Sequence, residues 1–185
     1  VVAAPEVYGE APARLTASGW AELAGKWTAL ADWALSEALN DEERCPVAAR
    51  LVEEAARPVR EAVDAAPVPA EETPREGPET ARSLMQGLLQ VGVAMLMVAS
   101  SRPASGSEHH LAHYWEMRDL LEGREPALHG ERVGVASLMV QRLYRTVLAT
   151  QPQAWPEPVT VSAGEHEQRV REAYGRAAQG LQEEQ

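Results

Sequence analysis

Apolar residues recur every three or four positions along most of the chain, which is the spacing of amphipathic helices. The first such run covers about residues 19–39, with Thr16 or Ser18 as the expected N-cap. Further helical runs are found at about residues 46–65, 80–99, 107–121, 130–149 and from 165 onward, with Ser107 as the expected cap of the third of these. No alternating strand pattern and no internal repeat accompanies them. The pattern therefore predicts an all-α fold, a helical bundle.

Proline and glycine separate the predicted helices. Residues 1–18 are expected to be a short extended lead-in, and residues 66–79 a solvated, proline-rich connector. Pro58 lies inside a helical run and should kink or split that helix. The run at 80–99 is apolar on nearly every face, so we expect it in the middle of the bundle. Because each flank of the connector is too small to fold alone, residues 1–185 are predicted to form one helical domain.

Charge and length narrow the possible partners. The 185 residues contain 28 acidic and 17 basic side chains, a net charge of -11, which argues against nucleic acid as a partner. The longest apolar stretch, at 84–99, contains two glutamines and is too short for a membrane span. A single cysteine, Cys45, and the lack of a leader sequence predict a cytoplasmic protein.

Potential metal ligands are concentrated in one region. His109 and His113 are four residues apart and share a helical face, and His129 follows at a predicted helix start. Glu22 lies among apolar neighbours, with Lys26, the one lysine of the chain, a turn further on. A carboxylate in such surroundings needs a partner, and two imidazoles with one carboxylate are a common ligand set for zinc or iron. Ordinary surface histidines and a solvated glutamate remain the alternative interpretation.

Several catalytic motifs are missing from the sequence. It has no HExxH, no CxxC pair, no P-loop, no GxSxG and no GxGxxG turn that would hold a dinucleotide. The chain therefore shows no nucleotide-binding site of its own.

The run SSRPASGSEHHLAHYWEM, followed by LHGERVGV, resembles the sn-glycerol-1-phosphate dehydrogenases of the iron-containing alcohol dehydrogenase superfamily. The strings APARLTASG, GKWTALADW and VREAYG are also similar, so the resemblance spans about residues 1–176. It implies the all-helical, metal-binding C-terminal domain of such an enzyme, which packs against an N-terminal nucleotide-binding domain. NAD(P) and substrate would meet between the two domains, where dihydroxyacetone phosphate is reversibly reduced.

The resemblance also implies roles for individual residues. His109 and His129 match the metal-binding histidines, and Glu22 falls at the position of the carboxylate ligand. His113 matches a histidine near the substrate, and Lys26 matches a lysine able to hold an anionic group. The family usually has aspartate where this chain has Glu22, and the string GWAEL instead resembles the dehydroquinate synthases, whose metal is held by one glutamate and two histidines.

These observations lead to one main expectation and two alternatives. The main expectation is the metal-binding domain of an NAD(P)-dependent dehydrogenase acting on a small phosphorylated or polyol substrate, with Zn²⁺, Fe²⁺ or Ni²⁺ at the site. NAD(P) would bind only where a nucleotide-binding domain or partner chain is present, so this chain alone is not expected to be a dehydrogenase. A homodimer is also expected. The alternatives are a metal-dependent lyase, cyclase or isomerase on the same site, and a non-catalytic helical module.

Overall fold

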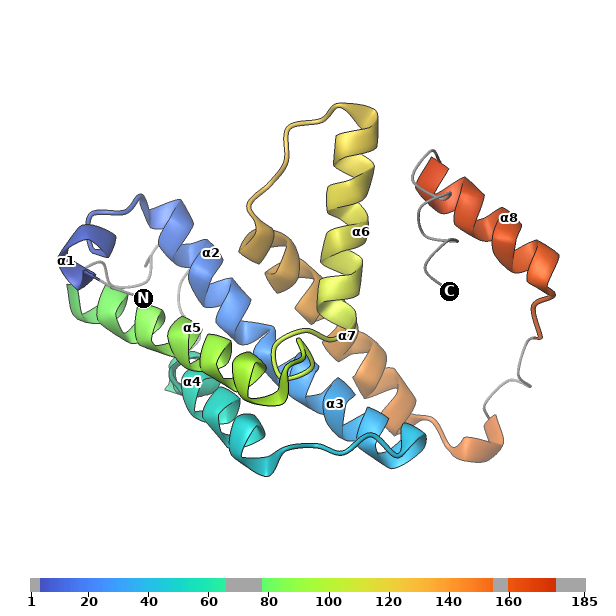
Figure 1. Ribbon diagram of the computed structural model, residues 1–185, viewed down its shortest axis with the longest axis horizontal. Coiled ribbons are helices and arrows are strands. Elements are labelled where there is room, and N and C mark those ends of the chain that lie inside the picture. The colour runs from blue at the N-terminus through green and yellow to red at the C-terminus, as the bar shows by residue number, and fades with distance from the viewer. Residues whose placement is uncertain (1–3, 66–77, 155–159, 176–185) are drawn as a thin grey trace.

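The computed structural model describes residues 4–65, 78–154 and 160–175, and every regular element within these ranges is helical (Figure 1). The helices are α1 (Pro5–Tyr8), α2 (Ala13–Ala24), α3 (Lys26–Asn40), α4 (Pro46–Ala65), α5 (Pro78–Val98), α6 (Ser107–Glu122), α7 (His129–Ala149), the 3₁₀ turn η1 (Pro152–Ala154) and α8 (Ala163–Tyr174). The predicted all-α fold is confirmed.

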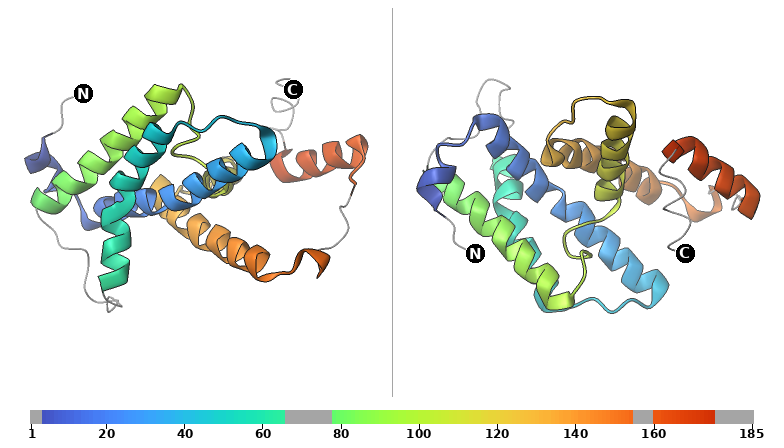
Figure 2. Two further views of the ribbon diagram at one scale, coloured as in Figure 1. Left: turned by 90° about the horizontal axis from the view of Figure 1, so that it is seen from below. Right: turned by 45° about the horizontal axis from the view of Figure 1, so that its top comes forward.

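Helices α2 and α3 follow each other in nearly the same direction and form the centre of the molecule (Figures 1 and 2). Helices α4 and α5 pack together on one side of them, and α6 and α7 pack together on the other. Between α2–α3 and α4–α5 lies the largest apolar core, in which Leu23, Trp33, Val52 and Ala94 are almost completely buried. The central helices therefore link the core to the side of the molecule that carries the histidines.

The first long helix is divided, contrary to the single helix predicted at 19–39. It begins at Ala13, with Pro12 rather than Thr16 or Ser18 at the N-cap position, and it is interrupted at Gly25. A Cβ atom at Gly25 would lie 2.7 Å from Cγ1 of Val133, so α7 approaches too closely there for a side chain. The predicted end near residue 40 is correct, since Asp41 adopts a left-handed φ of 53°.

Three further differences lie in segments that contain proline. Residues 5–8 form the short helix α1 instead of an extended lead-in, and Pro5 stands at its first position, where a missing N–H is tolerated. The proline-rich connector lies largely outside the described residues, but its last two predicted residues already belong to α5. Pro58 does not split α4, which continues from Pro46 to Ala65.

Helix α5 is not in the middle of the bundle, so that prediction is wrong. Helices α1, α2 and α4 cover one side of it, while Leu96 is 82% exposed and Val93 is 50% exposed. Over Glu79–Val98, α5 is long and apolar enough to cross a membrane, judged by length and composition alone. The apolar stretch at 84–99, which the sequence indicated to be too short for a span, covers only part of this segment. Core helices of other proteins meet the same criterion, so this is weak evidence for a membrane span.

The start of α6 is fixed by a residue from another helix. The cap position is Gly106 rather than the predicted Ser107. Asp32 of α3 accepts hydrogen bonds from the backbone N–H and the hydroxyl of Ser107, and Tyr144 of α7 donates to the same carboxylate. Three helices are thereby joined two residues before His109.

The two remaining helices agree closely with prediction. Helix α7 begins one residue before the predicted start, and α8 begins two residues before it. At α8, Ser162 and Glu165 form a capping box. Tyr174 at the end of α8 makes an edge-to-face contact with Tyr114 of α6, with ring centroids 5.5 Å apart.

Candidate metal centre

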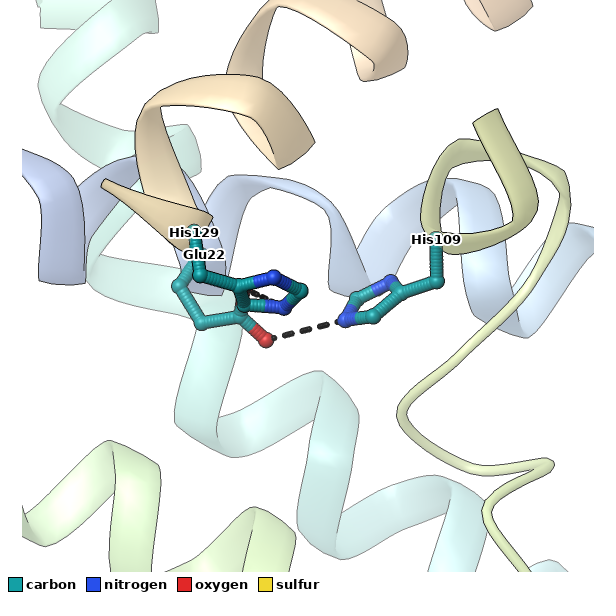
Figure 3. A group of neighbouring side chains, drawn as sticks. All are labelled: Glu22, His109 and His129. Carbon is teal, nitrogen blue, oxygen red and sulfur yellow. Dashed lines mark hydrogen bonds and ion pairs between the residues drawn. The ribbon is translucent and has the colours of Figure 1, made fainter. Parts of the chain in front are cut away.

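Three helices bring Glu22, His109 and His129 together. Glu22 projects from α2, His109 from the first turn of α6, and His129 is the first residue of α7 (Figure 3). Nε2 of His109 lies 3.2 Å from Oε1 of Glu22, and Nε2 of His129 lies 3.6 Å from Oε2 of the same carboxylate. One potential ligand atom from each residue lies within 4.8 Å of the other two.

The Glu22 side chain is partly buried, and its two carboxylate oxygens have different partners. Oε1 accepts a hydrogen bond from the Lys26 ammonium and faces His109. Oε2 is buried and has no hydrogen-bond partner. Burial alone would raise the pKa of Glu22, but hydrogen bonds and charge from His109 and Lys26 outweigh it and lower the pKa to about 2. Glu22 is therefore an anion with one unused oxygen.

His109 lies between two carboxylates. Its Nδ1 is 2.7 Å from Oε1 of Glu108, while its Nε2 faces Glu22. Burial lowers the pKa of His109, but the two glutamates outweigh this effect and raise it above the usual value. A neutral ring with its proton on Nδ1 would direct a lone pair at the Glu22 oxygen. A positive charge, either a proton or a cation, is needed between these two atoms.

The residues present fit a divalent cation. Zinc bonds to nitrogen and oxygen are about 2.0–2.1 Å long, so neighbouring ligands of a tetrahedral ion lie about 3.4 Å apart. The nitrogen–oxygen separations at Glu22 are 3.2 Å from His109 to Oε1 and 3.6 Å from His129 to Oε2, so each ring lies at ligand spacing from one of the two carboxylate oxygens. The unpartnered Oε2 gives the same indication, because a buried carboxylate oxygen without a partner is costly.

A cavity of about 620 Å³ opens beside the candidate ligands. Its walls include Glu22 and His109, together with Lys26, His113 and Tyr174. The cavity therefore offers space for a small molecule next to the place where a cation fits.

The structure places Lys26 and His113 differently with respect to solvent. Lys26 is 1% exposed, and its ammonium donates to Oε1 of Glu22 and, over 2.7 Å, to the carbonyl oxygen of Ala104. His113 is more than half exposed, and its ring stacks on that of His129 with centroids 5.1 Å apart. Both residues predicted to contact substrate therefore lie at the cavity, but two of the three N–H donors of Lys26 are already used.

Sequence reasoning missed two glutamates behind the histidines. Glu108 is completely buried and contacts Nδ1 of His109. Glu116 contacts Nδ1 of both His113 and His129, each over 2.8 Å. Helical spacing from His109 and His113 to Glu116 was a signal available in the sequence, because steps of four and three residues keep one face.

Close approach of two helices sets the position of His129. Gly130, the second residue of α7, touches α2, where a Cβ atom would lie 2.0 Å from the carbonyl oxygen of Ser18. No side chain fits there. The contact places the start of α7 directly against the helix that carries Glu22.

The fold and the site together define an all-helical protein with a candidate carboxylate–histidine metal centre beside a cavity. No family model matches the chain. Several individual curated proteins are similar to it. A glycerol-1-phosphate dehydrogenase (NAD(P)+) of Bacillus licheniformis is 37% identical over 143 residues, which cover 77% of this chain and 34% of the relative.

Similar relatives occur in other organisms. The enzyme of the same name in Bacillus subtilis is 39% identical over 136 residues, covering 73% of this chain and 32% of the relative. The enzyme of the same name in Methanothermobacter thermautotrophicus is 37% identical over 145 residues, covering 78% of this chain and 38% of the relative. The chain belongs to the glycerol-1-phosphate dehydrogenase family, and it spans about a third of the length of the relatives it matches.

Proposed function

We propose that this chain is the metal-binding helical part of an NAD(P)-dependent glycerol-1-phosphate dehydrogenase. The observation that carries the proposal is the convergence of Glu22, His109 and His129 beside a cavity, with one buried Glu22 oxygen unpartnered. The names of the relatives support dehydrogenation over a lyase, cyclase or isomerase reaction. The nucleotide-binding part would lie outside residues 1–185, which form one domain, and the complete enzyme would act in the cytoplasm.

Glu22, His109 and His129 would hold the cation, with zinc, iron and nickel all compatible with two nitrogens and one carboxylate. Such an ion, when bound, supplies Lewis-acid polarisation of a ketone oxygen. The chain's own contribution is the arrangement of the ligands, which the packing of α7 against both α2 and α6 fixes before any substrate enters. Preorganised charge of this kind stabilises negative charge that develops on the substrate.

Substrate contacts would come from the cavity wall. His113 is accessible and lies beside His129, so it is placed to orient or protonate an oxygen of a small keto-phosphate such as dihydroxyacetone phosphate. Lys26 keeps Glu22 ionised and has one N–H donor left for an anionic group. The buried ammonium thus links the metal ligand to the substrate cavity.

The first test is metal binding by the chain as it stands. Purified protein, stripped with a chelator and titrated with Zn²⁺ in a competition assay, should bind about one ion per chain, because the site has three protein ligands. The variant His109→Ala should abolish tight binding. His166→Ala changes an exposed histidine of α8 and is the matched control, expected to bind like the unaltered chain. If the unaltered chain binds no ion, the proposal fails.

The second test is turnover. The chain joined to the nucleotide-binding part of the Bacillus subtilis relative should oxidise NAD(P)H when dihydroxyacetone phosphate and a divalent ion are present. His109→Ala should lower the rate by about 100-fold or more, the usual scale for losing an electrostatic stabiliser. A metal-loaded, folded fusion that is inactive with every small keto-phosphate tried would contradict the assigned reaction.

A further inference from the structure

We propose that Glu116 is a positioning residue that fixes the proton of His129 on Nδ1 and so keeps Nε2 free to bind a cation. The inference rests on the proposed metal site and adds a residue to it. Glu116 lies on α6, whereas His129 begins α7, so the contact joins two helices.

The geometry of the Glu116 carboxylate determines the tautomers around it. Oε1 lies 2.8 Å from Nδ1 of His129, and Oε2 lies 2.8 Å from Nδ1 of His113. An ionised carboxylate accepts hydrogen bonds but cannot donate them, so each ring must place its N–H on Nδ1. In the neutral ring of His129 the lone pair is then on Nε2, the atom 3.6 Å from Oε2 of Glu22.

The buried guanidinium of Arg132 lies next to the carboxylate of Glu116. Arg132 is 5% exposed and donates to Asp119, while its Nη1 lies 3.8 Å from Oε1 of Glu116 and has no hydrogen-bond partner. The carboxylate of Glu116 therefore lies among two imidazoles and one cation. These contacts favour the anionic, accepting form that the proposed role requires.

The other histidine of the site has the same arrangement, which supports the inference independently. Oε1 of Glu108 lies 2.7 Å from Nδ1 of His109 and also accepts from the backbone of Gly106. Thr28 donates to the second oxygen of Glu108. Both candidate metal histidines thus have a carboxylate on Nδ1 and point Nε2 toward Glu22. Metal-binding histidines generally have such partners, which orient the ring and raise its basicity.

His113, Glu116 and His129 also lie close enough to form a cation site of their own, since one potential ligand atom from each lies within 4.8 Å of the other two. Both oxygens of Glu116 are already at hydrogen-bond distance from ring nitrogens, however. A cation there would take Nδ1 of His129 and remove the contact that directs Nε2 toward Glu22. The contacts therefore favour positioning over a second site, and the experiment below distinguishes the two.

The test uses the 185-residue chain with Glu116→Gln. Glutamine keeps the size of the side chain but offers one accepting oxygen and one donating amide, so it cannot accept from both rings. We expect Zn²⁺ affinity in chelator competition to fall by about 10- to 100-fold, with stoichiometry unchanged at one ion. Glu122→Gln, which alters an exposed ion pair on the same helix, is the matched control and should bind like the unaltered chain.

A second measurement reports the tautomer directly. Nitrogen-15 NMR of the metal-free chain should show His129 protonated on Nδ1, and this signature should be lost in Glu116→Leu, whose side chain has no acceptor, but kept in Glu122→Gln. A merely structural role for Glu116 would leave the tautomer unchanged.

Each result has a defined meaning. An unchanged tautomer in Glu116→Leu together with unchanged Zn²⁺ affinity in Glu116→Gln overturns the inference, as does a second bound ion that Glu116→Gln loses. If the unaltered chain binds no ion at all, the proposed function fails instead, and the spectrum of the metal-free chain still decides whether Glu116 fixes the proton of His129.

Discussion

At the scale of single residues, the centre is built from charges that neutralise one another. Lys26 supplies a buried ammonium to Glu22, and His109 stands between Glu22 and Glu108. Each of these groups would be costly to bury alone, because a charge without a partner in the interior loses its hydration without compensation. The cluster is therefore stable only as a set, and removing one member should alter how the others respond to pH.

The pH dependence of stability tests this for Glu22. Its pKa is lowered from 4.5 to about 2 in the folded chain, so the contribution of the carboxylate is complete above pH 4.5 and is lost as the pH falls toward 2. In the metal-free chain, we expect the stability gap between the unaltered protein and Glu22→Gln to be on the order of 3 kcal/mol near neutral pH and to narrow in that acidic window. Urea unfolding at a series of pH values measures the gap. A gap that is constant down to about pH 2 would contradict the role assigned to Glu22.

The sequence allowed part of the site to be predicted, for identifiable reasons. Glu22, His109 and His129 were chosen from residue type, local spacing and family resemblance, and the structure brings them together, although metal binding itself stays a prediction. Glu108 was missed because a lone glutamate on a helix carries no local signal of what it faces. Glu116 was missed although its spacing from His109 and His113 places it on their helix face, because that spacing does not show that it also contacts His129. Their contacts depend on the packing of α6 against α3 and α7, which no local pattern encodes.

At the scale of helices, close contact between α2 and α7 decides where His129 lies. Gly130 allows this contact, since any Cβ atom there would overlap the backbone of Ser18. Gly25 does the same on the other side of the Glu22 position, against Val133. Two glycines thus set the distance between the helices that supply two of the three candidate ligands.

Gly130→Ala should therefore weaken metal binding without touching a ligand. The added methyl group forces α7 away from α2, which separates His129 from Glu22, and we expect a stability loss of about 1–3 kcal/mol, typical of overpacking, together with lower Zn²⁺ affinity. The control is Gly92→Ala in α5, where a Cβ atom would meet nothing within 4 Å and the change should be neutral or stabilising by up to about 1 kcal/mol. Equal unfolding and metal-titration curves for the two variants would show that the contact does not position His129.

Most helices could be predicted because their apolar spacing is a local property, as the agreement at α4, α7 and α8 illustrates. The break at Gly25 could not, because residues on both sides of it keep the helical pattern, and the close approach of α7 at this glycine is a contact between segments far apart in the chain. The cap of α6 by Asp32 escaped prediction for the same reason: the acceptor lies 75 positions earlier in the chain. The predicted position of α5 in the middle of the bundle was wrong for another reason. An apolar composition shows that a helix favours apolar contacts, but it does not show which helices pack against it.

At the scale of the whole molecule, several helices keep large apolar side chains at the surface, and α5 and α7 are two of them. Leu96 on α5 is 82% exposed, while Leu138 and Leu143 on α7 are 64% and 62% exposed. Soluble chains rarely leave large apolar patches uncovered. This is consistent with the homodimer predicted from the sequence, which stays a prediction.

Light scattering of the purified chain tests the dimer. We expect a mass twice the 20.1 kDa of one chain, since association would bury exposed leucines at about 25 cal/mol per Å² of apolar surface. Measurement over a range of protein concentrations would separate a stable dimer from weak association. A mass of one chain at every concentration would refute it.

The two-sided contacts of His109 have a consequence for how the site is filled. With Nδ1 committed to Glu108, a proton on the opposite edge of the ring occupies the same gap next to Glu22 that an ion would take. The proton and the metal ion cannot occupy this gap together, so binding of the ion requires release of the proton. In an unbuffered solution near neutral pH, each ion captured by the metal-free chain should release up to one proton, and uptake should become harder as the medium grows more acidic.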